Sequence, residues 1–93
     1  MGAGGIPNRA INIFEGRKLD DEGEPNTRSD LYQNGKLKQS RWYGPDGKAV
    51  RNRDYFHQDS HHNHKFPHDH NWNWANNPPR DPNWVEPDYK NFN

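Results

Sequence analysis

Short runs of apolar and polar residues, separated by two turn motifs in the middle of the chain, predict a three-stranded antiparallel meander over residues 28–56. Asn34-Gly35 favours a type I′ hairpin turn after the first strand, because both central residues of that turn need positive φ. Gly44-Pro45-Asp46-Gly47 predicts the second turn, since proline presets φ and the last glycine can close the loop. We expect the buried surface of this sheet to include Leu31, Leu37, Trp42, Val50 and Tyr55.

Both ends of the chain have the composition of loops. Residues 1–22 are rich in glycine and predict a flexible N-terminal segment, in which residues 11–14 form either a strand or a hydrophobic anchor. Residues 71–93 are rich in Asn, Pro and Trp, and proline excludes a regular helix because it removes backbone donors. We therefore expect an irregular tail that wraps over the sheet, pinned by Trp72, Trp74, Trp84 and Tyr89.

The aliphatic core that this sequence can form is small. Leu, Ile, Val and Phe make up 12 of the 93 residues, which lies below the roughly 20% level at which disorder becomes common. The net charge is zero, however, and aromatic residues make up 13% of the chain. We expect one small, mainly β domain over residues 23–93, with a small α+β fold as the alternative. A histidine-rich loop held by a metal ion would add to the stability that the small core provides.

Composition also excludes several classes of function. No apolar run is long enough to span a membrane, and the N-terminus lacks the features of a signal peptide, so we expect a cytoplasmic protein without a membrane partner. The absence of cysteine excludes disulfides, thiol nucleophiles and thiolate zinc sites. Charge neutrality argues against strong nonspecific nucleic-acid binding, although Arg41-Trp42-Tyr43 mixes cations and rings as single-strand readers do. Ordinary cross-strand pairing is the interpretation that we favour for that run.

All six histidines fall within residues 57–70, and imidazole and carboxylate are the zinc ligands left to a chain without cysteine. His68-Asp69-His70 is the sharpest element, because residues two apart on an extended strand project from the same face. Such a site would couple metal binding to folding. The candidate ligands are His68, His70, His57, Asp54, His61, His62 and His64, with Asp59 as a further carboxylate.

Two other hypotheses account for the same histidines. They form a polar, solvated loop that binds metal only adventitiously, or they work as an acid and base pair. In the second case His68 and His70 would cleave RNA through its 2′-hydroxyl without a metal. Arg41, or else Arg51 or Arg53, would offset the charge of the phosphate.

The order of motifs resembles a known family. Gly23-Glu24-Pro25-Asn26, Asn34-Gly35-Lys36, Arg41-Trp42-Tyr43-Gly44 and Pro67-His68-Asp69-His70-Asn71-Trp72 are similar to a small domain of phage head-morphogenesis proteins and bacterial polymorphic toxins with a Pro-His-x-His-x-Trp motif. The resemblance covers residues 23–74. It implies a site at Arg41, Asp54, His68 and His70, joined by His57 or one of the histidines within residues 61–64.

The resemblance also implies a protein of a phage or other mobile element that works inside a bacterial host. We expect a non-enzymatic, zinc-binding protein that binds and inhibits a host bacterial factor, for example a CRISPR effector or another defence nuclease. A metal-independent endoribonuclease of the toxin type is the first alternative. A virion morphogenesis module, which would self-associate, is the second.

Overall fold

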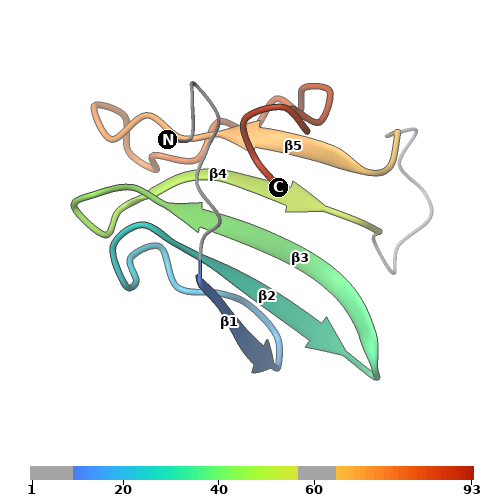
Figure 1. The fold of residues 1–93 in the computed structure, drawn as a ribbon. Helices are drawn as coiled ribbons and strands as arrows, with labels where there is room; N and C mark the ends of the chain where they lie inside the picture. Colours follow the sequence, from blue (N-terminus) through green and yellow to red (C-terminus); the bar gives the residue numbers. More distant parts are fainter. Residues whose placement is uncertain (1–9, 57–64) are drawn as a thin grey trace.

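The protein forms a single five-stranded mixed sheet. The computed structural model describes residues 10–56 and 65–93, and no helix occurs within these two ranges, so none of them forms a helix that spans a membrane. Figure 1 shows the strands side by side in chain order. They are β1 (Ala10–Glu15), β2 (Thr27–Gln33), β3 (Lys36–Tyr43), β4 (Ala49–Asp54) and β5 (His68–Asn71). The expectation of a mainly β fold is confirmed, and the predicted meander corresponds to β2, β3 and β4.

Both predicted turns of the meander are present. Asn34 and Gly35 have φ values of 54° and 78°, as a type I′ turn between β2 and β3 requires. Gly47 has a φ of 82°, and its amide donates to the carbonyl of Gly44 over 2.9 Å to close the second turn. Local turn chemistry thus sets the connections of β2, β3 and β4.

β1 pairs in parallel with β2, whereas every other neighbouring pair is antiparallel. Residues 11–14 therefore form a strand rather than an isolated anchor. A parallel pair needs a crossover connection, which residues 16–26 provide without a helix, and Leu19 in this connection is buried. β1 lies at the sheet edge, where Ile11, Ile13 and Phe14 are 50%, 68% and 49% exposed.

Few apolar side chains are fully buried among the described residues. They are Leu19, Leu31, Trp42, Tyr43 and Ala49. Leu31 and Trp42 were expected there, Leu37 and Tyr55 are half-buried, and the expectation for Val50 is wrong because it is 37% exposed. Trp42 pairs with Arg51 and the next residue of β3 pairs with Ala49, so Val50 is the extra residue of a β-bulge and turns outward.

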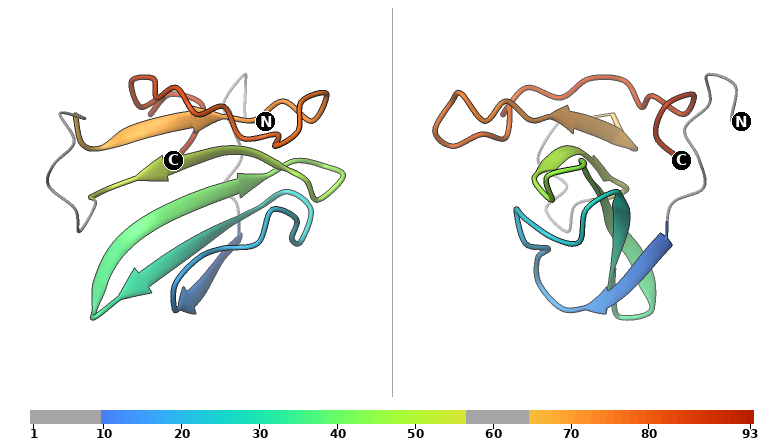
Figure 2. Two further views of the ribbon diagram at one scale, coloured as in Figure 1. Left: turned by 180° about the vertical axis from the view of Figure 1, so that it is seen from behind. Right: turned by 60° about the vertical axis from the view of Figure 1, so that its left-hand side comes forward.

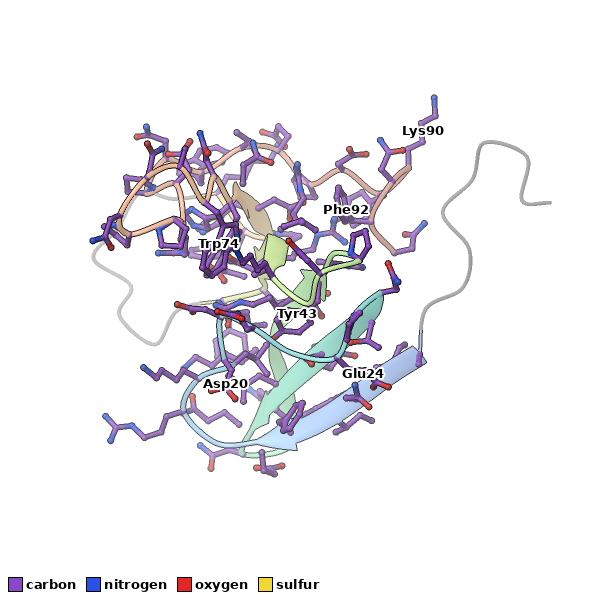
Figure 3. The ribbon with its side chains drawn as sticks, turned by 90° about the vertical axis from the view of Figure 1, so that its left-hand side faces the viewer. Asp20, Glu24, Tyr43, Trp74, Lys90 and Phe92 are labelled. Carbon is purple, nitrogen blue, oxygen red and sulfur yellow. The ribbon has the colours of Figure 1, made fainter. Side chains whose placement is uncertain are left out.

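The C-terminal tail covers the outer edge of β5 and reaches both sides of the sheet (Figure 2). Asp69 of β5 and Val85 of the tail exchange two backbone hydrogen bonds of 2.9 and 2.8 Å. On one side of the sheet the indole of Trp74 donates to the Ala49 carbonyl, and on the other Phe92 packs edge-on against Trp42 (Figure 3). The tail therefore closes one sheet edge, whereas within residues 10–56 and 65–93 no segment pairs with the outer edge of β1, which we call the open edge.

The register of β3, β4 and β5 gives the sheet two polar faces, because directly opposed residues share a face. We call one the histidine face and the other the arginine face. The histidine face carries Gln39 and Arg41 from β3, Asn52 and Asp54 from β4, and His68 and His70 from β5. The arginine face carries Ser40, Trp42, Arg51, Arg53 and Asp69.

Candidate metal centre

Three potential metal ligands meet on the histidine face where β4 ends beside β5. Asp54 lies opposite His68 in the register, and His70 lies two pairs further along, opposite Asn52. Oδ2 of Asp54 is 3.3 Å from Nε2 of His68 and 3.4 Å from Nε2 of His70. The three side chains are only 1–6% exposed. Their ligand atoms all lie within 4.8 Å of one another, so the group has the composition and spacing to hold a metal ion.

Backbone carbonyls fix the orientation of both imidazoles. Nδ1 of His68 lies 2.9 Å from the carbonyl oxygen of Lys65, and Nδ1 of His70 lies 2.8 Å from that of Asp81. A carbonyl oxygen only accepts, so each Nδ1 carries the proton and donates it. In the neutral rings Nε2 then presents a lone pair toward Asp54. This is the arrangement typical of metal-ligating histidines.

Two amide side chains hold the carboxylate of Asp54. Gln39 donates from Nε2 over 2.6 Å and Asn52 donates from Nδ2 over 3.2 Å, both to the Oδ1 atom. Because these hydrogen bonds use Oδ1, the other oxygen is the one that faces the histidines. The amides thereby orient Asp54 as a ligand that offers Oδ2.

Trp72 and Arg41, whose side chains can only donate hydrogen bonds, set the orientation of the Asn52 and Gln39 amides. Trp72 donates its indole N–H to Oδ1 of Asn52 over 2.7 Å, so the Asn52 nitrogen must point to the aspartate. Arg41 donates to Oε1 of Gln39 over 3.3 Å, with the same consequence for that amide. Two chains of hydrogen bonds therefore converge on the carboxylate of Asp54.

Electrostatics keep Asp54 ionised. Burial raises the pKa of this carboxyl, but the hydrogen bond from Gln39, the charge of Arg80 and, when its ring is protonated, the hydrogen bond and charge of His70 outweigh burial and hold its pKa well below the usual range. A carboxylate ligates a metal in its ionised form, which the surroundings favour here.

Aromatic rings close the centre around His68. The imidazole centroid of His68 lies 4.5 Å from that of Phe66 and 5.7 Å from that of Trp84, which stacks on it at 25°. These rings restrict water around the imidazole, and a less polar surrounding strengthens electrostatic interactions within the group.

Asp69 lies between the two histidines in sequence but takes no part in the group. Its side chain points to the arginine face, where it is fully buried and accepts hydrogen bonds from Arg51 and Arg53 at 2.7 Å each. Arg53 itself lies between the rings of Trp42 and Tyr89, at 4.9 and 4.5 Å from their centroids. The alternation of β5 thus separates a ligand face from an ion-pair face.

The structure brings together Asp54, His68 and His70 of the predicted ligands. His57, His61, His62 and His64, like Asp59, lie outside the described residues. Arg41 is on the same face, but its guanidinium donates to the carbonyls of Leu19 and Asp20 and stacks over Trp72.

Sequence reasoning missed the two amides and Arg80. The alternation of β3 and β4 was the available signal for the amides, since Gln39 precedes Arg41 by two positions and Asn52 precedes Asp54 by two. Arg80 comes from the irregular tail, and its Nη2 lies 3.7 Å from Oδ2 of Asp54. No periodic pattern in the tail marks it.

The fold and the site together define a small mixed β-sheet protein with a buried His-His-Asp group. Comparisons with protein-family models, with curated proteins and with solved structures find no match to this chain. Its function must therefore be inferred from its own residues, and the resemblance to the Pro-His-x-His-x-Trp domains stays a prediction.

Proposed function

We propose that this chain is a zinc-binding protein whose ion is held by Asp54, His68 and His70. The observation that carries the proposal is the convergence of both Nε2 atoms on one carboxylate oxygen, while both Nδ1 atoms donate to backbone carbonyls. Three buried atoms that each carry a lone pair face one another in this arrangement. A cation between them relieves their repulsion.

Protons are the other cations that could fill this role, and they fit less well. Two protonated imidazoles would sit with ring centroids 5.0 Å apart and with the guanidinium of Arg80 beside them. Charge-assisted N–H···O bonds are usually about 2.7–2.9 Å long, whereas the separations here are 3.3 and 3.4 Å. One divalent ion replaces both protons without placing two charged rings together.

Two of the three separations between ligand atoms agree with tetrahedral coordination. With zinc bonds of about 2.0–2.1 Å, neighbouring ligand atoms of a tetrahedron lie about 3.3–3.4 Å apart. The two Nε2–Oδ2 distances, 3.3 and 3.4 Å, have these values. Two imidazoles and one carboxylate are also an established zinc ligand set, with a fourth position left for another ligand.

A bound ion would stabilise a fold that has little else to hold β5. The described core contains few fully buried apolar side chains, and none of them comes from β5. Asp54 ends β4 and both histidines belong to β5, so the ion would join these strands. Because the unfolded chain lacks the site, the free energy of metal binding adds to the free energy of unfolding.

Within this proposal, the zinc-stabilised sheet acts without catalysis by binding and inhibiting a host bacterial factor. The support from the described residues is β1, an open edge strand on which Ile11, Ile13 and Phe14 are about half exposed or more. Exposed strand edges are sites where a partner protein can add a strand. A CRISPR effector or another defence nuclease is the partner class that the family resemblance suggests.

Elemental analysis of protein purified without a tag tests the metal site. We expect one zinc per chain, lost in His68→Gln and His70→Gln because each removes an Nε2 ligand. A control in which His61, His62 and His64 are all replaced by Asn removes the histidine-rich run and should keep the zinc. Cobalt substitution adds a second measurement, because tetrahedral Co²⁺ absorbs visible light strongly.

A wild-type chain that carries no zinc and keeps its fold in chelator would contradict the metal proposal. Zinc that is lost from the triple control and kept in His70→Gln would instead assign the metal to adventitious capture.

The inhibitory role has its own test. Expression of the chain in a bacterium with an active CRISPR system should restore phage plaques, and Ile13→Glu should abolish this effect while leaving the zinc content unchanged. The substitution places a charge on the open edge of β1 and far from the proposed ligands in sequence. Equal plaque numbers with and without the chain would count against the inhibitor proposal.

A metal-independent endoribonuclease is the second candidate, favoured by one observation. Arg80 places a guanidinium beside two imidazoles, and such a set could bind a phosphate while the rings transfer protons. In this case Arg80, rather than the carbonyl-bound Arg41, would contact the phosphate. RNA cleavage that persists in chelator and disappears in His68→Gln would support this candidate over the zinc proposal.

A further inference from the structure

Arg80 is placed at the metal centre by backbone pairing between the tail and the end of β5. The amide of Asn73 donates to the Pro79 carbonyl and the amide of Asp81 donates to the Asn71 carbonyl, each over 2.8 Å. Trp72 and Arg80 are thus bridge partners, which share a face of the sheet. The tail therefore directs Arg80 to the same side as Asn52, which Trp72 contacts.

The guanidinium of Arg80 makes no hydrogen bond to any other residue within 10–56 and 65–93. Its contact there is the 3.7 Å approach of Nη2 to Oδ2 of Asp54, which is too long for a hydrogen bond. Arg28, Arg41, Arg51 and Arg53 each donate to a protein acceptor at 2.7–2.9 Å. The Arg80 side chain is 39% exposed, so ligands from solvent can reach its outer donors.

The charges around the proposed zinc are not balanced. Zinc contributes two positive charges and Arg80 one, against the single negative charge of Asp54, while the imidazoles are neutral as ligands. A net positive charge in a largely buried site is costly unless an anion compensates it. The three ligands that the described residues supply leave one zinc position for that anion.

We propose that the zinc ion and Arg80 together bind a phosphate group, with one phosphate oxygen on the metal and others on the guanidinium. This inference rests on the proposed zinc function. A phosphate monoester carries about two negative charges near pH 7 and offers three terminal oxygens, so it can meet both cations at once. The planar fork of arginine matches phosphate oxygens in geometry. A carboxylate, with one charge and two oxygens, compensates the centre only in part.

Isothermal titration calorimetry of the zinc-loaded protein with inorganic phosphate tests the proposal. Wild-type protein should bind one phosphate, and Arg80→Gln should weaken binding about tenfold or more, because hydrogen bonds to a charged group are lost. Arg17→Gln is the matched control, since Arg17 is an exposed arginine of the β1–β2 connection. Both variants should keep one zinc per chain.

Binding of adenosine 5′-monophosphate and of adenosine shows whether the ligand is a phosphate monoester or free phosphate. A monoester ligand predicts that the nucleotide binds at least as tightly as free phosphate while the nucleoside does not bind. Tighter binding of free phosphate than of the nucleotide would overturn a monoester in favour of the free ion.

Three results would overturn the proposal itself. They are equal phosphate affinity in wild-type and Arg80→Gln, equal affinity with and without zinc, and acetate that binds as tightly as phosphate. The zinc content of the protein distinguishes a failure of the phosphate proposal from a failure of the zinc proposal. A chain without zinc overturns both proposals, whereas a zinc-loaded chain that does not bind phosphate overturns this one alone.

Discussion

Asp69 and Arg53 form a buried, bidentate ion pair on the face of the sheet opposite the metal centre. Nε and Nη2 of Arg53 donate to the two carboxylate oxygens over 2.7 and 3.0 Å, and Asp69 is fully buried. The same carboxylate accepts the backbone amide of Asp88, so it also holds the C-terminal tail. One aspartate therefore joins β4, β5 and the tail.

Asp69→Asn should destabilise the protein by about 3–5 kcal/mol, because it leaves two buried guanidinium groups without a counter-charge. Urea denaturation followed by tryptophan fluorescence measures the free energy of unfolding. Glu86→Gln is the matched control, since Glu86 pairs with Lys65 but both side chains are more than 60% exposed. That pair should contribute at most about 1 kcal/mol. Similar losses in the two variants would contradict the assigned role of Asp69.

Trp72→Phe should weaken zinc binding about tenfold while leaving the fold intact. The phenyl ring keeps the apolar contacts but lacks the N–H that orients the Asn52 amide, and loss of a group that orients a metal ligand typically costs 10- to 100-fold in affinity. Competition with a chromophoric chelator measures the affinity.

Trp74→Phe provides the control for Trp72→Phe. Its indole donates to the carbonyl of Ala49 and not to the hydrogen bonds around Asp54, so the same change there should leave zinc affinity unaltered. Equal effects of the two substitutions would show that the Asn52 amide does not orient the ligand.

Two glycine substitutions should separate backbone strain from steric conflict. Gly35→Ala should cost about 1–2 kcal/mol, because φ is +78° and nothing lies near the added methyl group. Gly47→Ala should cost more, since φ is +82° and the new Cβ would lie 2.6 Å from the Gly23 carbonyl oxygen. Thermal denaturation ranks the two variants. A smaller loss at Gly47 would mean that the 16–26 connection does not pack against this turn.

Ionisation of the Tyr43 phenol should make the protein less stable at alkaline pH. Burial raises the pKa of its phenol, despite the opposing charge of Arg41, and the hydroxyl donates to the Asp20 carbonyl over 2.6 Å. Below the unfolded pKa of about 10 the phenol is neutral in both states, and its contribution is complete. As the pH rises above 10 the unfolded state ionises first, so the free energy of unfolding falls.

Urea titrations at pH 9 and pH 11 measure this dependence. Tyr43→Phe should lose less stability between these pH values than wild type. Parallel declines in the two proteins would assign the pH effect to other groups.

Much of the sheet follows from short-range patterns. Asn34-Gly35 requires a tight hairpin whatever surrounds it, and β5 alternation places His68 and His70 on one face with Asp69 on the other. The pairing of Asp54 with these histidines was predictable as a candidate from ligand chemistry alone. The outward position of Val50 was not, because a bulge depends on how two strands align.

The sequence by itself determined the mainly β class, the two turns of the meander and the side-by-side placement of two imidazoles, since φ preferences and the two-residue strand repeat are local properties of the chain. Only the tertiary structure decided which groups surround them. Gln39 and Arg80 reach Asp54 from 15 and 26 residues away, through the register of β3 with β4 and the pairing of the tail with β5. Long-range pairing of this kind depends on the packing of the whole sheet, which no local pattern encodes.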